Sequence, residues 1–106
     1  LLFLCYYLCV RINKVVNMIV EIKNIKQLGA IAKQVRQSQS LDQETAGMLS
    51  GNGLTFISQF ENGKESVEIG RVFKLFEQLG IEVDINLPPN LAEKSLQKIN
   101  QLIGKS

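Results

Sequence analysis

Few residues of this chain could catalyse a reaction or hold a metal ion. Its 106 residues include no histidine, and the only two cysteines, Cys5 and Cys9, lie close together near the N-terminus. A catalytic triad, a His/Cys zinc site and a secreted disulfide framework therefore lack the residues they need. The run Gly51-Asn52-Gly53 lacks the flanking strand and the lysine of a phosphate-binding loop. We therefore predict no catalytic residue, no metal and no cofactor, and a protein that works by binding and not as an enzyme.

Hydrogen-bonding side chains cluster between positions 54 and 64. The members that face outwards from a helix over about 54–61, or follow it directly, are Thr55, Ser58, Gln59, Asn62 and Lys64. A glutamine amide can pair with both N6 and N7 of adenine, and hydroxyl groups serve several bases. We expect Asn62 and Lys64, and Gln43 further upstream, to contact phosphate oxygens. The same side chains also suit any solvated helix, so spacing alone leaves both interpretations open.

Sequence periodicity and capping residues place these side chains in a bundle of short helices. The first three predicted helices cover residues 25–38, 43–50 and 54–61. Asn24 and Gln27 have the spacing of a capping box, Asp42 is a suitable N-cap, and Gly51 ends the second helix. Two short helices joined by a glycine-containing turn form a helix-turn-helix. The second helix of such a pair can lie in the major groove of DNA.

A fourth helix is predicted after the turn at Asn62. We expect Ser66 to cap it and Gly80 to follow its last residue. Its inward-facing stripe is predicted to be Ile69, Val72, Phe73, Phe76 and Leu79.

Beyond Gly80 the period of the apolar residues changes to two, which is typical of a half-buried strand. The apolar members of this strand are Ile81, Val83, Ile85 and Leu87. A single strand has to pair with the apolar run Met18–Ile22, with its copy in a second chain, or with both. We favour the second chain, which predicts a homodimer.

Segments at the two ends differ from this body. Leu1–Val10 is uninterrupted apolar sequence, too short for a helix that crosses a bilayer, which needs about 20 residues. We interpret residues 1–17 as sequence upstream of the true start at Met18; a membrane-surface anchor and an element packed on the domain are the alternatives. The rest divides into a domain over 18–87 and a C-terminal amphipathic helix within 88–106. The apolar stripe of that helix is Ala92, Leu96, Ile99 and Ile103.

The charge balance limits bulk attraction to nucleic acid. The whole chain has 12 basic and 10 acidic residues, but two of the basic ones, Arg11 and Lys14, lie in residues 1–17, where no acid occurs. From Met18 onwards the formal net charge is therefore zero. Any DNA binding has to come from the local placement of charges, because a nucleic-acid binder usually has a basic surplus.

The stretch LDQETAGMLSGNGLTFISQFENGK, from Leu41 to Lys64, resembles the Xre/Cro-type helix-turn-helix. The positions in register are Leu41, Gln43, Gly51, Ile57, Ser58, Glu61, Asn62, Gly63 and Lys64. The resemblance implies a mainly α fold, a lambda-repressor-like bundle of four to five helices with one C-terminal strand paired across a dimer. Within this superfamily the chain is most similar to HipB-type antitoxins. That similarity implies a cytoplasmic autorepressor that binds a palindromic operator in double-stranded DNA, and a HipA-like Ser/Thr kinase as toxin partner. A standalone Xre-type regulator and a protein-interaction module without useful DNA affinity are the alternatives.

The resemblance also implies roles for individual residues. Arg36 and Glu61 match a pair that bridges two helices inside the domain in relatives, and we expect a structural ion pair. Leu54 stands where relatives often have a polar base-reading residue; together with Thr55, Ser58 and Gln59 it completes the predicted base-reading set. Gly47 departs from the pattern, and glycine inside a helix costs about 0.8–1 kcal/mol relative to alanine. We therefore expect the 43–50 helix to have low intrinsic stability.

Overall fold

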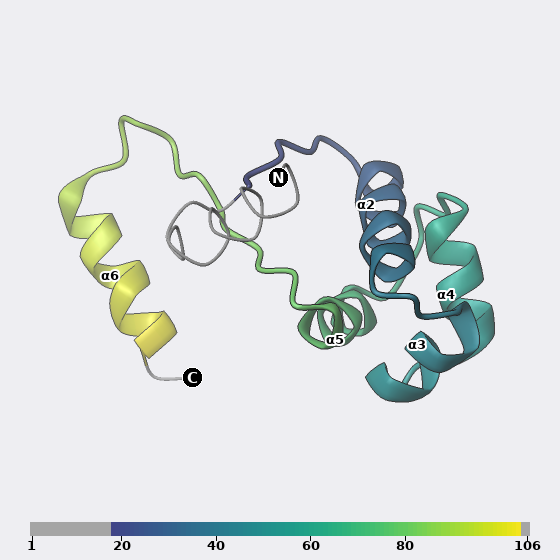
Figure 1. Ribbon diagram of the computed structural model, residues 1–106. Coiled ribbons are helices and arrows are strands. Elements are labelled where there is room, and N and C mark those ends of the chain that lie inside the picture. The colour runs from purple at the N-terminus through teal and green to yellow at the C-terminus, as the bar shows by residue number, and fades with distance from the viewer. Residues whose placement is uncertain (1–17, 105–106) are drawn as a thin grey trace, which may run out of the picture.

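The computed structural model describes residues 18–104. Within this range the chain forms five helices, which are α2 (Ile25–Ser38), α3 (Gln43–Ser50), α4 (Leu54–Glu61), α5 (Ile69–Leu79) and α6 (Glu93–Gly104). Figure 1 shows α2, α3, α4 and α5 packed together. The mainly helical fold and the bounds predicted for the first three helices are confirmed.

The predicted capping residues begin α2 and α3 as expected. The Asn24 side chain accepts a hydrogen bond from the Gln27 backbone N–H at 2.9 Å, and the Gln27 side chain accepts one from the Lys23 backbone N–H. Asp42 accepts from the Thr45 backbone N–H at 2.7 Å. This hydrogen bond holds the pKa of the Asp42 carboxyl below its ordinary value, because it stabilises the charged form.

Helix α5 differs from its prediction in both its start and its buried face. The backbone N–H groups of Arg71 and Val72 donate to the Glu68 carbonyl, so the helix begins at Ile69 and Ser66 lies outside its first turn. The prediction that Ser66 caps α5 is therefore wrong. The buried stripe is Val72, Leu75, Phe76 and Leu79. Ile69 and Phe73, predicted to face inwards, are about half exposed because this stripe turns them towards solvent.

The hydrophobic core lies between α2, α3, α4 and α5. Its fully buried members are Ala32, Ala46, Ile57, Phe60, Val72, Leu75, Phe76 and Leu79. The Phe60 ring stands at its centre, 5.8 Å from the ring of Phe56 and 6.2 Å from that of Phe76, measured between centroids. These separations suit attractive aromatic pairs. The core therefore fixes one face of α4 and leaves the opposite face to solvent.

Helices α2 and α4 approach each other closely at Gly29, which is buried in α2. A Cβ atom at this position would collide with the backbone carbonyl of Phe60 in α4. Backbone atoms cannot move aside as a flexible side chain can. Gly29 thus sets how near the two helices lie, a role that helix periodicity did not indicate.

The predicted strand over Ile81–Leu87 is not formed in the described part of the chain. Residues 81–88 run as an extended segment without strand pairing, and so does Met18–Ile22. Val83 and Ile85 are 47% and 80% exposed. The prediction of a strand is wrong for the single chain, because the pattern describes a strand that needs a partner and one copy supplies none.

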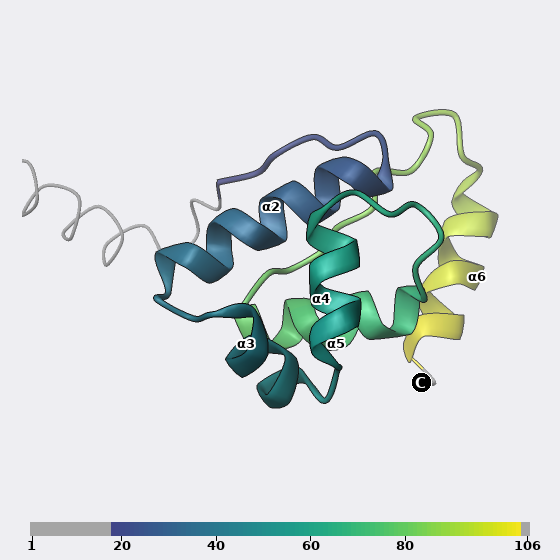
Figure 2. The same ribbon diagram turned by 90° about the vertical axis from the view of Figure 1, so that its right-hand side faces the viewer.

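Figure 1 shows helix α6 apart from the bundle α2–α5, at the end of this extended segment, whereas the perpendicular view of Figure 2 projects it beside the end of α5. None of its residues is buried. Among residues 18–104, no helix is long and apolar enough to cross a membrane. The interpretations of residues 1–17, including Cys5 and Cys9, lie outside the described residues.

Replacing Gly29 by alanine should lower the free energy of unfolding. We expect a net loss of about 1–3 kcal/mol, because overpacking at the contact with Phe60 outweighs the gain in helix propensity. Gly70→Ala is the matched control: a Cβ atom there meets nothing within 4 Å, so this variant should be unchanged or up to about 1 kcal/mol more stable. Urea unfolding of both variants checks this, and equal stabilities would contradict the close approach.

Candidate DNA interface

The turn between α3 and α4 is built from Gly51, Asn52 and Gly53. Gly51 has a φ of 74°, a left-handed conformation that glycine adopts without strain, and it closes α3. Asn52 is buried, and its amide nitrogen donates to Ser50 Oγ and to the Arg71 carbonyl of α5, both at 3.1 Å. The Ser50 hydroxyl in turn donates to the Ala46 carbonyl at 2.7 Å. This network fastens the turn to α5 and so fixes the direction in which α4 leaves it.

Gly47 belongs to the same construction. A Cβ atom on Gly47 would lie 2.9 Å from the Asn52 carbonyl oxygen, and the Asn52 N–H donates to the Gly47 carbonyl at 2.7 Å. Because Gly47 has no Cβ atom, the turn can fold back onto α3, at the cost of the lower helix propensity of glycine. The sequence analysis treated Gly47 only as a departure from the family pattern and missed its contact with Asn52.

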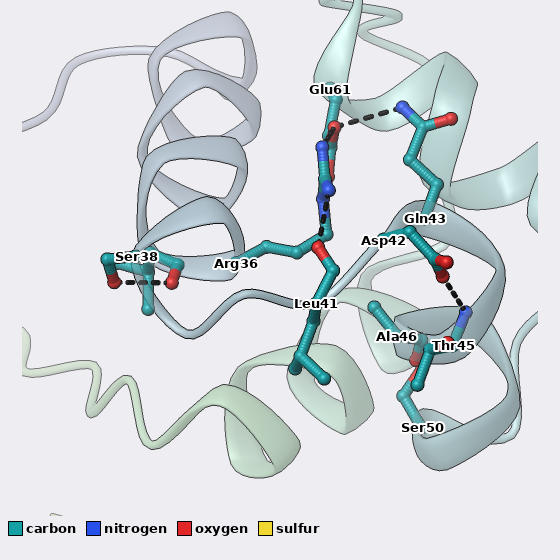
Figure 3. A network of polar contacts seen from close by, with 10 residues as sticks. Arg36, Ser38, Leu41, Asp42, Gln43, Thr45, Ala46, Ser50 and Glu61 are labelled. Atoms are coloured by element: carbon teal, nitrogen blue, oxygen red, sulfur yellow. Dashed lines mark hydrogen bonds and ion pairs between the residues drawn. The ribbon is translucent and has the colours of Figure 1, made fainter.

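An ion pair between Arg36 of α2 and Glu61 of α4 lies inside the domain, as predicted. Figure 3 shows the two side chains facing each other, with Arg36 Nε 2.6 Å from Glu61 Oε2 and Arg36 Nη2 2.8 Å from Glu61 Oε1. The side chains are only 8% and 2% exposed. The hydrogen bond to Glu61 raises the pKa of Arg36 above its ordinary value. The bidentate geometry of the pair orients α4 against α2.

Two further groups complete the shell of this pair. Arg36 Nη1 donates to the Leu41 carbonyl at 2.7 Å, and the Gln43 amide nitrogen donates to Glu61 Oε1 at 3.0 Å (Figure 3). Gln43, predicted to contact phosphate, thus uses one of the two N–H donors of its amide inside the protein. The second N–H remains for a contact outside the domain. Through this hydrogen bond to Glu61, Gln43 holds the start of α3 to the end of α4.

The predicted base-reading residues share the solvent side of α4. Thr55 and Gln59 are exposed, Ser58 is half-buried, and Leu54 is 51% exposed. Asn62 follows as the C-cap of the helix. Lys64 is also exposed, and its ammonium group donates to Gln59 Oε1 at 3.2 Å. The structure therefore brings together every predicted DNA-contacting residue except Gln43, which lies at the start of α3 and faces the ion pair.

Short helices α3 and α4 joined by a tight turn, with the second helix turning polar side chains outwards, define a helix-turn-helix domain. The helix-turn-helix family model (HTH_3) matches residues 33–86. An uncharacterised HTH-type transcriptional regulator of Sinorhizobium fredii, y4mF, is 37% identical over 67 residues, which are 63% of this chain and 88% of the relative. The chain belongs to the helix-turn-helix family of DNA-binding transcriptional regulators, which is not a family of enzymes.

Solved structures agree with this assignment. HipB in a HipB-O1-O2 complex superposes with a TM-score of 0.60 at 25% identity, covering 65% of this chain and 100% of HipB. A HipA-HipB-O2-O3 complex contains a chain similar to this one, with a TM-score of 0.61, 25% identity, and coverage of 65% and 97%. The restriction-modification controller protein C.AhdI of Aeromonas hydrophila gives a TM-score of 0.51 at 29% identity, over 55% and 84% of the two chains. The bundle α2–α5 thus has the fold of known regulators.

Replacing Glu61 by glutamine should destabilise the domain by about 3–5 kcal/mol, because the buried Arg36 guanidinium then lacks its counter-charge. Glu68→Gln is the matched control. Glu68 pairs with Arg71 at 3.1 Å on the surface, where the side chains are 72% and 49% exposed, and such pairs contribute at most about 1 kcal/mol. Chemical denaturation of both variants measures the difference. A loss from Glu61→Gln no larger than that from Glu68→Gln would contradict the structural role of the buried pair.

Proposed function

We propose that this protein is a sequence-specific repressor that inserts α4 into the major groove. Leu54, Thr55, Ser58 and Gln59 would contact base edges. Asn62, Lys64 and Gln43 would contact phosphates, the last with the amide N–H that is not bonded to Glu61. The observation that carries this proposal is the division of α4 into two faces. Ile57, Phe60 and Glu61 hold one face inside the domain, while the polar side chains of the other stay accessible.

Repression would require a dimer on a palindromic operator, with half-sites about one helical turn apart. The body from Met18 onwards has no net charge, so one domain offers little non-specific attraction to DNA. Pairing of the extended segment Ile81–Leu87 with its copy would satisfy the unpaired backbone groups of both. The exposure of Val83 and Ile85 in the single chain supports this pairing.

The same protein would act as antitoxin of a HipA-like Ser/Thr kinase and repress its own operon in the cytoplasm. The support for this partner is the likeness to HipB, which one solved structure contains together with HipA. A standalone regulator of the same family is the alternative when no kinase accompanies it. A protein-interaction module without useful DNA affinity is the second alternative. It is favoured by α6, where Leu96 and Leu102 are 41% and 67% exposed.

Substituting Gln59 and Lys64 together by alanine should weaken binding to the protein's own promoter by at least about tenfold, because the base contact of Gln59, of a kind that contributes about 1–3 kcal/mol, and the phosphate contact of Lys64 are both lost. Fluorescence anisotropy with labelled promoter DNA measures the change. Co-purification with the kinase should be unaffected, since neither residue lies on α6.

The matched control is Lys74→Ala with Gln78→Ala, which removes the same residue types from the exposed side of α5. This control should bind the promoter like the unmodified protein. If the Gln59/Lys64 variant keeps full promoter affinity, α4 does not read the DNA and the proposed function fails.

Replacing Ile85 by lysine should convert the dimer into a monomer, because a charge would then lie in the apolar side of the paired segments. Asn86→Lys adds the same charge on the alternate side of the segment and should leave the dimer intact. Sedimentation velocity distinguishes the two states. A dimer that survives Ile85→Lys, or a monomeric unmodified protein, would contradict pairing through this segment.

A further inference from the structure

Gln59 and Lys64 form a unit on the solvent side of α4. The Lys64 ammonium donates to Gln59 Oε1 at 3.2 Å, and both side chains are exposed. In the described part of the chain, the Gln59 amide nitrogen has no hydrogen-bond partner. The pair therefore presents mainly hydrogen-bond donors to a ligand at this end of α4. Gln59 alone would present a donor and an acceptor.

The backbone holds the two side chains together. Helix α4 ends in a Schellman motif: the Gly63 N–H donates to the Phe60 carbonyl at 3.1 Å and the Lys64 N–H donates to the Gln59 carbonyl at 3.0 Å. Gly63 has a φ of 91°, which glycine adopts readily and which reverses the chain. These main-chain hydrogen bonds thus bring the Lys64 backbone back to the Gln59 carbonyl, so that the Lys64 ammonium lies within reach of the Gln59 side chain.

The chemistry of the contact decides which atoms remain. An ammonium group has three donors and no acceptor, so only the oxygen of the Gln59 amide can face it. The amide then offers its NH₂ group, while its oxygen is shared with a cation whose remaining N–H donors oppose the N6 amino group of adenine and suit an acceptor. Bidentate pairing of glutamine with adenine needs one donor and one acceptor, whereas guanine presents two adjacent acceptors, N7 and O6, in the major groove.

We infer that Lys64 is a specificity-determining residue that directs Gln59 to read guanine instead of adenine. The Gln59 NH₂ and the Lys64 ammonium would donate to the two acceptors of one guanine. This inference rests on the proposed DNA-reading function and replaces the phosphate contact expected of Lys64. It assigns the lysine a role in base choice, which a phosphate contact would not have.

Selection from a pool of randomised DNA duplexes, followed by sequencing, tests the inference with the full chain. The unmodified protein should enrich guanine at one position of each half-site. Lys64→Ala should shift that single position towards adenine, changing the guanine-to-adenine ratio by about 5- to 150-fold. Lys64→Arg keeps a donor-only cation and should retain guanine. Lys74→Ala, on α5, should leave the selected sequence unchanged.

Three results would overturn the inference in distinguishable ways. An unchanged selected sequence for Lys64→Ala, with uniformly weaker binding and a smaller salt dependence, makes Lys64 a phosphate contact and leaves the proposed function standing. Enrichment of adenine at this position by the unmodified protein would show that Gln59 does not read guanine, and it would also leave the proposed function standing. No enriched sequence at all for the unmodified protein removes the proposed function and the inference with it.

Discussion

The buried ion pair between Arg36 and Glu61 is the interaction on which the rest of the domain depends. It joins the end of α2 to the end of α4, and its remaining hydrogen-bonding groups reach the Leu41 carbonyl and the Gln43 amide. One charged cluster therefore fixes α2, the loop after it, the start of α3 and the end of α4. Because burying two charges is expensive, such a pair adds little net stability. Its effect here is on geometry, since each partner satisfies the other only in one arrangement of the helices.

Residues that bring backbones close together complete this arrangement. Gly29 lets α2 lie against the carbonyl of Phe60, and Gly47 lets the turn fold onto α3. Asn52 then bonds the turn to the Arg71 carbonyl of α5. The reading face of α4 is thus positioned from three directions by contacts on its hidden side. This explains how a helix of eight residues can present its outer side chains in a defined orientation to DNA.

Much of this fold could be predicted from the sequence, because its signals are local. Capping residues such as Asn24 and Asp42 marked the helix starts, and the glycines at 51 and 63 marked the turns. Spacing alone did not reveal the Arg36–Glu61 pair, 25 residues apart; it came from resemblance to a family. The contacts of Gly29 with Phe60 and of Asn52 with the Arg71 carbonyl join residues far apart in the sequence, so no local pattern indicated them. Ser66 failed as a cap because it lies two residues before Glu68, the N-cap of α5.

The prediction of a strand over Ile81–Leu87 was wrong for a different reason: the alternating pattern indicates which side of a strand is apolar but not which segment pairs with it, and the described residues supply no pairing partner. The site shows the same limit. The sequence indicated which polar residues face outwards, but not that Gln43 donates to Glu61 or that Lys64 donates to Gln59. Such hydrogen bonds form only where a turn or a neighbouring helix brings the two side chains together in space. They change which polar atoms remain free to contact DNA.

The central claim is that α4 reads DNA sequence. Its most direct test is a fluorescence-anisotropy titration of the unmodified protein with its own promoter DNA, beside a scrambled duplex of the same length and composition, at two salt concentrations. We predict tighter binding to the promoter than to the scrambled duplex, with affinity for both falling steeply as salt rises. Equal and weak binding to the two duplexes at both salt concentrations would contradict the claim.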